Sequence, residues 1–405
     1  MSQTKLFTLS CALLLTLIPL VASQAADQPA ASQPASAAAP GATMPLPTPP
    51  TVDARSYVLM DYDSGQVLAE QNGDARAEPA SLTKLMTAYI VFSALRDGRL
   101  KLTDPVTISE HAWRTGGSRT FAQVGTQIPA DILIKGMLVQ SGNDATVALA
   151  ERIGGTEPGF VQLMNEYAAR LGLTGTHFAD SNGLPDPNHY TTAHDIARLS
   201  AAIIRDFPQY YPIFSLREFT WNNIRQDNRN GLLDTDPSVD GLKTGHTDAA
   251  GYCLAASAKR NGMRLIAVVM GSDSFKGREN ASEALLNYGF NFFQTAIVHK
   301  KGEPVLLPRV YKGAEKYVAV APNADIAVTV PRGQSGSLST SAQVTQTLMA
   351  PLTTTTPVGR FTVTVGGREL VSVPLYPVKD VPSGGLWRRF VDSLALFFQS
   401  LRRLF

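Results

Sequence analysis

The stretch EPASLTKLMTAYIVFSAL, residues 78–95, indicates more about this 405-residue chain than any other part of its sequence. After Pro79 it is apolar on almost every side, as in a helix that is buried all round, and an Asp-Gly pair follows it. Ser81 and Lys84 lie three residues apart, so a helix places both on one face. A serine beside an amine base is an activated nucleophile. We therefore predict a buried helix from Ser81 to Leu95 with a reactive pair at its start.

Two further short motifs follow, Ser141-Gly142-Asn143 and Lys243-Thr244-Gly245. Each motif alone is weak, because such tripeptides occur by chance and Ser141-Gly142-Asn143 also fits an ordinary turn between helices. Together, in this order and widely spaced, the three motifs indicate a serine acyl-transfer site.

The N-terminus has the pattern of a secretory signal, which we assign to residues 1–25. A lysine precedes a largely apolar run, and Ser23-Gln24-Ala25 is a small-x-small cleavage site. The run is short for a membrane span. Cleavage would leave Cys253 as the only cysteine, so no internal disulfide can form and the fold must depend on its core. Residues 26–50 are rich in Ala, Pro and Ser and indicate a linker.

Composition gives broad limits on class and partners. The chain has 36 Lys and Arg against 34 Asp and Glu, a net charge of +2, which gives no support to nucleic-acid binding. Its 44% of hydrophobic residues is typical of a globular protein, and its length favours two domains.

Residues 51–296 predict a mixed α/β domain with one antiparallel sheet, because strands at both ends of this range enclose a series of helices. Thr192 and Asp195 form a capping box, and Asn143 or Asp144 can cap the helix that follows the second motif. The expected strands are 56–70 (a hairpin), 241–244, 252–258 and 264–269, and the expected helices are 81–95, 130–140, 157–171, 193–205 and 281–294.

Two smaller units follow. Residues 297–381 carry short alternating strands between Gly, Pro and Asn turns and predict a small all-β domain. Residues 384–405 repeat large apolar residues at helical spacing, with arginines on other faces, which favours an interfacial membrane anchor over a helix packed on its own domain.

The motifs and their surroundings resemble the low-molecular-mass penicillin-binding proteins of the D-alanyl-D-alanine carboxypeptidase family. The resemblance implies the penicillin-binding-protein or serine β-lactamase-like transpeptidase fold, with an antiparallel sheet and a helical lobe. It also implies peptidoglycan stem peptides as substrates, covalent inhibition by β-lactam antibiotics, and a place on the periplasmic face of the bacterial inner membrane. The stretches that carry it are 78–87, 228–233, 240–247 and 265–271.

The resemblance implies how the reaction would start. Ser81 would attack the carbonyl of the penultimate D-Ala, and Lys84 would act as the neutral general base. An ordinary lysine is charged at neutral pH, so burial and a nearby second cation, Lys243, would have to lower its pKa. The backbone amides of Ser81 and His246 would form the oxyanion hole.

Other residues would bind substrate or move protons. Ser141 would relay a proton to the leaving amine, and Asn143 would bind the substrate backbone. Lys243 would add positive potential, Thr244 would bind the substrate carboxylate, and Arg229 would assist because a guanidinium suits that geometry.

We expect no cofactor and no metal, since no metal-binding motif is present and His189 and His194 fit surface or capping positions. Three other functions stay open: a D,D-endopeptidase that cuts cross-links, a serine β-lactamase, and an inactive peptidoglycan-binding scaffold. The sequence lacks the E-x-x-L-N stretch of a class A β-lactamase between the second and third motifs, and the intact Ser-Lys pair speaks against the scaffold. The sequence is compatible with a homodimer but does not determine the oligomeric state.

Overall fold

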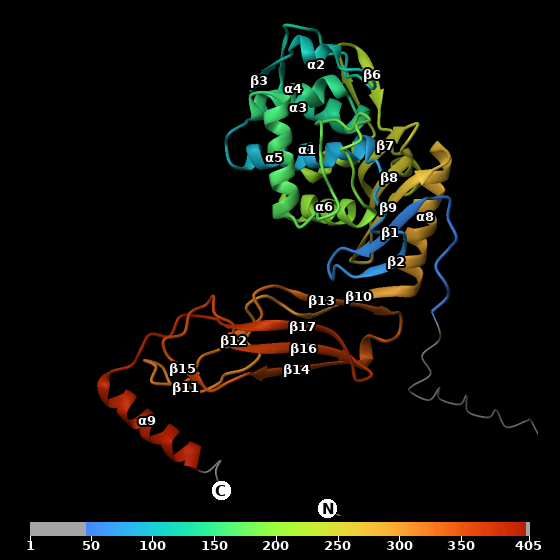
Figure 1. Cartoon of the computed structure of the whole chain (residues 1–405). Coiled ribbons are helices and arrows are strands. Elements are labelled where there is room, and N and C mark those ends of the chain that lie inside the picture. The colour runs from blue at the N-terminus through green and yellow to red at the C-terminus, as the bar shows by residue number, and fades with distance from the viewer. Residues whose placement is uncertain (1–45, 402–405) are drawn as a thin grey trace, which may run out of the picture. The chain divides into compact units, whose positions relative to one another are not determined.

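The computed structural model describes residues 46–401 (Figure 1). The predicted signal, most of the linker and residues 402–405 lie outside this range. At the end of the linker, the Pro47 carbonyl accepts a hydrogen bond from the Tyr288 hydroxyl at 3.0 Å. Within residues 46–401, none of the helices combines the length and the hydropathy needed to cross a bilayer.

An antiparallel sheet of five strands, in the order β2-β1-β9-β8-β7, forms the centre of the α/β domain. The first strand of the domain pairs with one of its last, with Val58 opposite Val268. Strand β7, which carries the Lys243 motif, lies at the edge of the sheet. The bounds are β1 Ser56–Asp61, β2 Val67–Gln71, β7 Val239–Thr247, β8 Gly251–Arg260 and β9 Met263–Ser272.

Helices cover both faces of the sheet (Figure 1). Side chains alternate along β1, so Val58 and Met60 join a core beneath the helical lobe while Tyr57 and Leu59 join a second core beneath α8. The helical lobe contains α1 Lys84–Arg96, α2 Glu110–Arg114, α3 Ala130–Lys135, α4 Asn143–Gly154, α5 Glu157–Arg170 and α6 Ala193–Asp206, and the other face carries α8 Phe275–Phe292.

Short elements complete this domain. Two small hairpins, β3–β4 and β5–β6, lie outside the main sheet. The bounds are β3 Pro105–Thr107, β4 Gln127–Pro129, β5 Glu218–Trp221, β6 Ile224–Asp227, α7 Leu232–Thr235, a π-helical turn Gly136–Gln140 and 3₁₀ turns at Ala80–Thr83 and Tyr211–Ser215.

The predicted fold class is confirmed, and three local expectations need correction. Ser81 lies in a 3₁₀ turn that precedes α1 rather than in the helix itself. The N-cap of α4 is Gly142, because the side chains of Asn143 and Asp144 bond elsewhere. Helix α8 begins at Phe275 rather than at 281, since Ser274 supplies an N-cap. Of the predicted capping box, the Thr192 half is confirmed, since its side chain accepts from Asp195 N at 3.1 Å. The Asp195 carboxylate does not return the bond, because its Oδ2 accepts from Gly175 N and Thr176 Oγ1 instead.

The C-terminal part has its own β-rich core, as the sequence predicts. Strand β10 pairs with β13, and a four-stranded sheet has the order β12-β17-β16-β14. The bounds are β10 Phe293–His299, β11 Val310–Tyr311, β12 Val320–Ala321, β13 Ile326–Pro331, β14 Leu338–Val344, β15 Leu348–Met349, β16 Gly359–Val365 and β17 Arg368–Pro377, with a 3₁₀ turn at Ser335–Ser337.

The last helix, α9 Leu386–Leu401, touches the β-domain through polar side chains. Asp392 is buried; its carboxylate accepts from Arg309 at 2.9 Å and from the Lys312 amide at 2.7 Å. Large apolar side chains on the helix are exposed instead, Trp387 by 77% and Phe398 by 61%. Burial therefore does not account for the apolar residues of this helix.

Candidate active site

The Ser81–Lys84 pair is formed by the 3₁₀ turn and the first residue of α1. Residues i and i+3 eclipse each other in a 3₁₀ turn, which brings the two side chains together. Lys84 Nζ lies 2.9 Å from Ser81 Oγ. Ser81 is partly exposed, whereas Lys84 is fully buried. The Ser81 hydroxyl is thus accessible while the Lys84 amine is withdrawn from water.

Two oxygen acceptors orient the Lys84 amine. Nζ donates to Asn143 Oδ1 at 2.7 Å and to the Asn182 carbonyl at 2.7 Å. Neither oxygen carries a proton, so each requires an N–H from the lysine. A neutral amine has two N–H groups and one lone pair. When both N–H groups are used in this way, the lone pair is left for the Ser81 hydroxyl proton.

The electrostatic environment favours a neutral Lys84. Burial lowers its pKa from 10.5 to about 7; Asp180 and Asp144 oppose this shift and Arg229 reinforces it. Burial also lowers the pKa of Lys243 well below its usual range, and Lys84 is the next largest cause. The repulsion expected between Lys84 and Lys243 is present, and Arg229 is a further cation that disfavours the charged form of Lys84. Because the two buried amines repel each other, the pair binds one proton more readily than two.

A strained backbone holds Ser81 in place. Ala80, directly before the nucleophile, has φ +46°, which is unusual for a residue with a Cβ. Gly183 packs against the Ala80 carbonyl so closely that a Cβ atom on Gly183 would overlap that oxygen. Gly183 also has φ +90°. The turn that contains Gly183 therefore fixes the position of the nucleophile from outside the Ser-Lys motif.

The Ser141-Gly142-Asn143 motif lies beside Lys84. Ser141 has φ +66°, and among the described residues its buried Oγ has no hydrogen-bond partner. Asn143 contributes Oδ1 to Lys84 and donates from Nδ2 to the Gly116 carbonyl at 2.6 Å. The second N–H of Nδ2 stays available to a ligand. The roles of both residues in proton relay and substrate binding stay predictions.

The third motif lies on edge strand β7, which passes alongside the nucleophile. A Cβ atom on Gly245 would lie 3.2 Å from the Ser81 nitrogen. Lys243 and Thr244 are buried, and His246 is exposed with its ring against Tyr252. An edge strand presents unpaired backbone groups that an extended peptide can bind. The expected oxyanion amides of Ser81 and His246 thus come from two adjoining segments.

Arg229 offers a cation near these amines. Arg229 is exposed as a whole residue, and partial desolvation lowers its pKa. Within residues 46–401, no carboxylate lies at ion-pairing distance from it. A ligand carboxylate can therefore bind there without displacing a protein partner.

Residues outside the three motifs, which no sequence pattern singled out, support this arrangement. His189 is buried rather than at the surface: Nε2 lies 2.8 Å from Thr83 Oγ1, and Nδ1 lies 3.3 Å from an oxygen of Asp180. His194 instead contacts the carboxylates of Glu70 and Asp74. The Asp-Ser-Asn-Gly pattern at 180–183 is a turn signal that could have directed attention here. No group of three potential metal-ligating side chains occurs within residues 46–401.

Comparison with known proteins matches both parts of the chain. Residues 43–274 match the family model described as D-alanyl-D-alanine carboxypeptidase, and residues 293–383 match that of the penicillin-binding protein 5 C-terminal domain. The chain is 44% identical to D-alanyl-D-alanine carboxypeptidase DacA of Escherichia coli K12, covering 87% of this chain and 90% of that protein. It is also 43% identical to DacC of the same organism, covering 86% and 89%.

Solved structures match the fold as well. Penicillin-binding protein 5 from Haemophilus influenzae gives a TM-score of 0.79 at 44% identity, covering 83% of this chain and 99% of that one. Penicillin-binding protein D2 from Listeria monocytogenes, in its ampicillin-bound form, gives 0.55 at 30% identity, covering 59% and 98%.

Proposed function

This chain belongs to the peptidase S11 family of D-alanyl-D-alanine carboxypeptidases, and from that membership and the site geometry we propose how it cleaves its substrate. It is a serine-type enzyme that removes the terminal D-Ala of peptidoglycan stem peptides and binds penicillins. The main support for the roles of individual residues is the set of hydrogen bonds that Lys84 forms with Ser81, Asn143 and the Asn182 carbonyl.

Acylation begins with proton transfer from the Ser81 hydroxyl to the lone pair of Lys84. Ser81 Oγ then bonds to the carbonyl carbon of the penultimate D-Ala, and the carbonyl oxygen takes up negative charge. The amides of Ser81 and His246 stabilise that charge. Ser141 passes the proton from Lys84 to the nitrogen of the terminal D-Ala, the C–N bond breaks, and an ester remains on Ser81. A β-lactam would acylate Ser81 in the same way: its ring C–N bond breaks, the ring nitrogen takes the proton from Lys84, and the opened ring stays attached to Ser81 as an ester.

Deacylation reuses the same base. Lys84, neutral again after the proton has left with D-Ala, takes a proton from a water that attacks the ester. Collapse of the intermediate returns a proton to Ser81 Oγ and releases the shortened stem peptide. Thr244, Lys243 and Arg229 bind the substrate carboxylate in this scheme, and Asn143 binds the substrate backbone.

A nucleophile test decides whether Ser81 has this role. Ser81→Ala should abolish both D-Ala release from a pentapeptide muropeptide and covalent labelling by a fluorescent penicillin. Ser93→Ala, which removes a serine from within α1, serves as the matched control and should keep both. Retained labelling of a folded Ser81→Ala protein would refute the assignment.

The same assay separates the competing activities. A cross-linked muropeptide dimer, followed by mass spectrometry, should yield monomers at a much lower rate than the pentapeptide yields D-Ala. Nitrocefin should acylate the enzyme without sustained turnover. Faster cleavage of the dimer would instead assign a D,D-endopeptidase.

We further propose that the chain is exported by residues 1–25 and held at the periplasmic face of the inner membrane by α9. The exposed Trp387, Phe390 and Phe398 support this, because such side chains insert at the acyl boundary of a bilayer. Truncation after Gly385 should release the protein from the membrane fraction without loss of activity on small peptides. Replacing Phe397 and Phe398 by Glu should also release it, whereas Ser393→Ala should not. A full-length protein found in the soluble fraction would exclude the anchor.

Domain extents and assembly stay predictions. Residues 51–296 and 297–381 are our proposed catalytic and β-rich domains. A homodimer can be tested by light scattering of the truncated protein.

A further inference from the structure

We propose that Asp144 and Asp180 are positioning residues for the Lys84 amine, each fastening the loop that presents one of its two oxygen acceptors. This inference rests on the proposed function, since it explains how the same base is held. Neither carboxylate belongs to the three sequence motifs.

Asp144 fastens the segment 116–122. Its carboxylate is buried; Oδ1 accepts from Thr120 N at 2.8 Å and Oδ2 accepts from Ala122 N at 3.0 Å. The fastened segment in turn holds Asn143, whose Nδ2 donates to Gly116 and whose backbone N donates to the Ser118 carbonyl at 2.7 Å. Asp144 therefore acts on Lys84 through Asn143 Oδ1.

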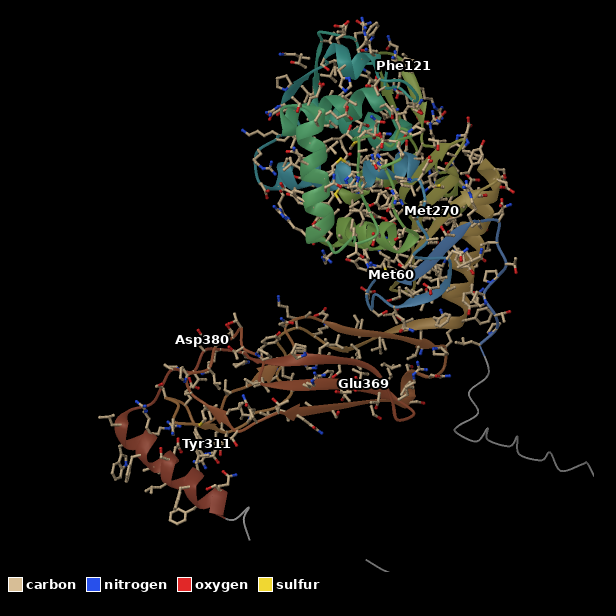
Figure 2. The ribbon with its side chains drawn as sticks, viewed as in Figure 1. Met60, Phe121, Met270, Tyr311, Glu369 and Asp380 are labelled. Atoms are coloured by element: carbon tan, nitrogen blue, oxygen red, sulfur yellow. The ribbon has the colours of Figure 1, made fainter. Side chains whose placement is uncertain are left out.

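The segment is tightly packed and strained where Asp144 holds it. A Cβ atom on Gly136 or Gly142 would overlap the Thr120 side chain, so the segment lies directly on the backbone of the second motif and of the π-helical turn before it. Phe121, labelled in Figure 2, has φ +63° and is half exposed. Its unfavourable backbone lies between the two amides that Asp144 binds. Such strain persists only where surrounding contacts enforce it.

Asp180 fastens the second acceptor in a similar way. One of its oxygens, Oδ1, accepts from Asn182 N at 2.8 Å and from Gly183 N at 2.6 Å. These bonds set the turn whose Asn182 carbonyl binds Lys84. The other oxygen lies 3.3 Å from His189, which contacts Thr83 in the Ser-Lys turn.

The two carboxylates also act by charge. Four charged groups bear on Lys84: Asp144 and Asp180 raise its pKa, Arg229 lowers it, and Lys243 is repelled by it. Removal of either negative charge should lower the pKa of Lys84. The acid limb of the acylation profile should then move to lower pH, which a merely structural defect would not cause.

Two substitutions separate charge from geometry. Asp180→Asn keeps an oxygen for both amides, and His189 can present an unprotonated Nδ1 to the new NH₂. Asp144→Asn cannot accept from both Thr120 N and Ala122 N, because its NH₂ group would face one of these N–H donors. Asp144→Glu keeps the charge but displaces it. Asp131→Asn, on α3 in a half-buried i,i+4 pair with Lys135, is the matched control.

The rate of Ser81 acylation by a penicillin is measured as a function of pH. Amide hydrogen exchange of residues 116–122 is measured on the same variants. Asp180→Asn should move the acid limb down by about half to one pH unit, and the plateau rate should change little. Asp144→Asn should show the same shift, a plateau lowered by about tenfold, and faster exchange at Thr120 and Ala122. Asp144→Glu should lower the plateau without moving the limb.

If the acid limb of the pH profile stays unchanged in both Asp180→Asn and Asp144→Asn, the inference is overturned. If Asp144→Asn does not fold, the acid limb of Asp180→Asn alone decides. These outcomes presuppose that the wild type is labelled at Ser81. If Ser81→Ala is still labelled, the proposed function fails instead, so the two failures are distinguishable.

Discussion

The rate of Ser81 acylation should follow the ionisation of Lys84, with a plateau at alkaline pH and an acid limb that falls tenfold per pH unit. The amine must be neutral to accept the serine proton, and its pKa is lowered from 10.5 to about 7. Acylation should therefore be half-maximal near this lowered value. Lys84→Arg should lose the reaction at every accessible pH, because a guanidinium does not deprotonate.

The magnitude follows from the fraction of neutral amine. With a pKa of about 7, roughly 90% of Lys84 is neutral at about pH 8 and roughly 1% at about pH 5, so the rate should fall about 90-fold. The lowered pKa corresponds to about 5 kcal/mol of differential stabilisation of the neutral form, at about 1.4 kcal/mol per unit. A lysine with an ordinary pKa would give a tenfold rise per unit throughout this range and no plateau.

The assay is single-turnover acylation by a fluorescent penicillin, measured in steps between about pH 5 and pH 9. Circular dichroism at each pH confirms that the protein stays folded. Lys135→Arg, at the half-buried C-terminal end of α3, is the matched control and should reproduce the wild-type profile. Lys84→Arg should reduce the plateau by about 10²–10⁴-fold, the usual contribution of a general base.

Two results would refute the reasoning. A rate that still rises tenfold per unit between about pH 8 and pH 9 would mean that burial does not lower the pKa of Lys84 as the structure indicates. Substantial acylation by Lys84→Arg would mean that the residue acts by its charge and not as a base.

Three further predictions address the surroundings of the site. Gly183→Ala should overlap the Ala80 carbonyl, so penicillin labelling should be strongly reduced or the melting temperature lowered by several degrees, and unchanged values in both measurements would contradict the packing. Arg229→Gln should raise KM for a D-Ala-D-Ala peptide more than it lowers kcat, and a pure kcat effect would argue against carboxylate binding. Thr192→Ala should cost about 1 kcal/mol in urea unfolding through loss of the α6 cap, and an unchanged midpoint would show that the cap contributes nothing.

The sequence itself determined the features that depend on short-range pattern. The apolar run after Ser81 specified a buried helix, apolar runs bounded by turn residues specified the strands, and Thr192 specified a helix start. The spacing of Ser81 and Lys84 was enough to predict their contact, because that geometry depends on a single turn of backbone.

Only the tertiary structure determined which distant residues meet at the site. Asp180 and His189 lie about a hundred positions from Lys84, so no local pattern could connect them with it. Asn143 and Asp144 are residue types that often cap helices, yet both side chains form hydrogen bonds with residues distant in the sequence. These tertiary contacts outweigh the local capping preference, which is worth about 1 kcal/mol. The pKa of Lys84 was beyond sequence reasoning for the same reason, since it depends on how completely the folded chain excludes water from one amine.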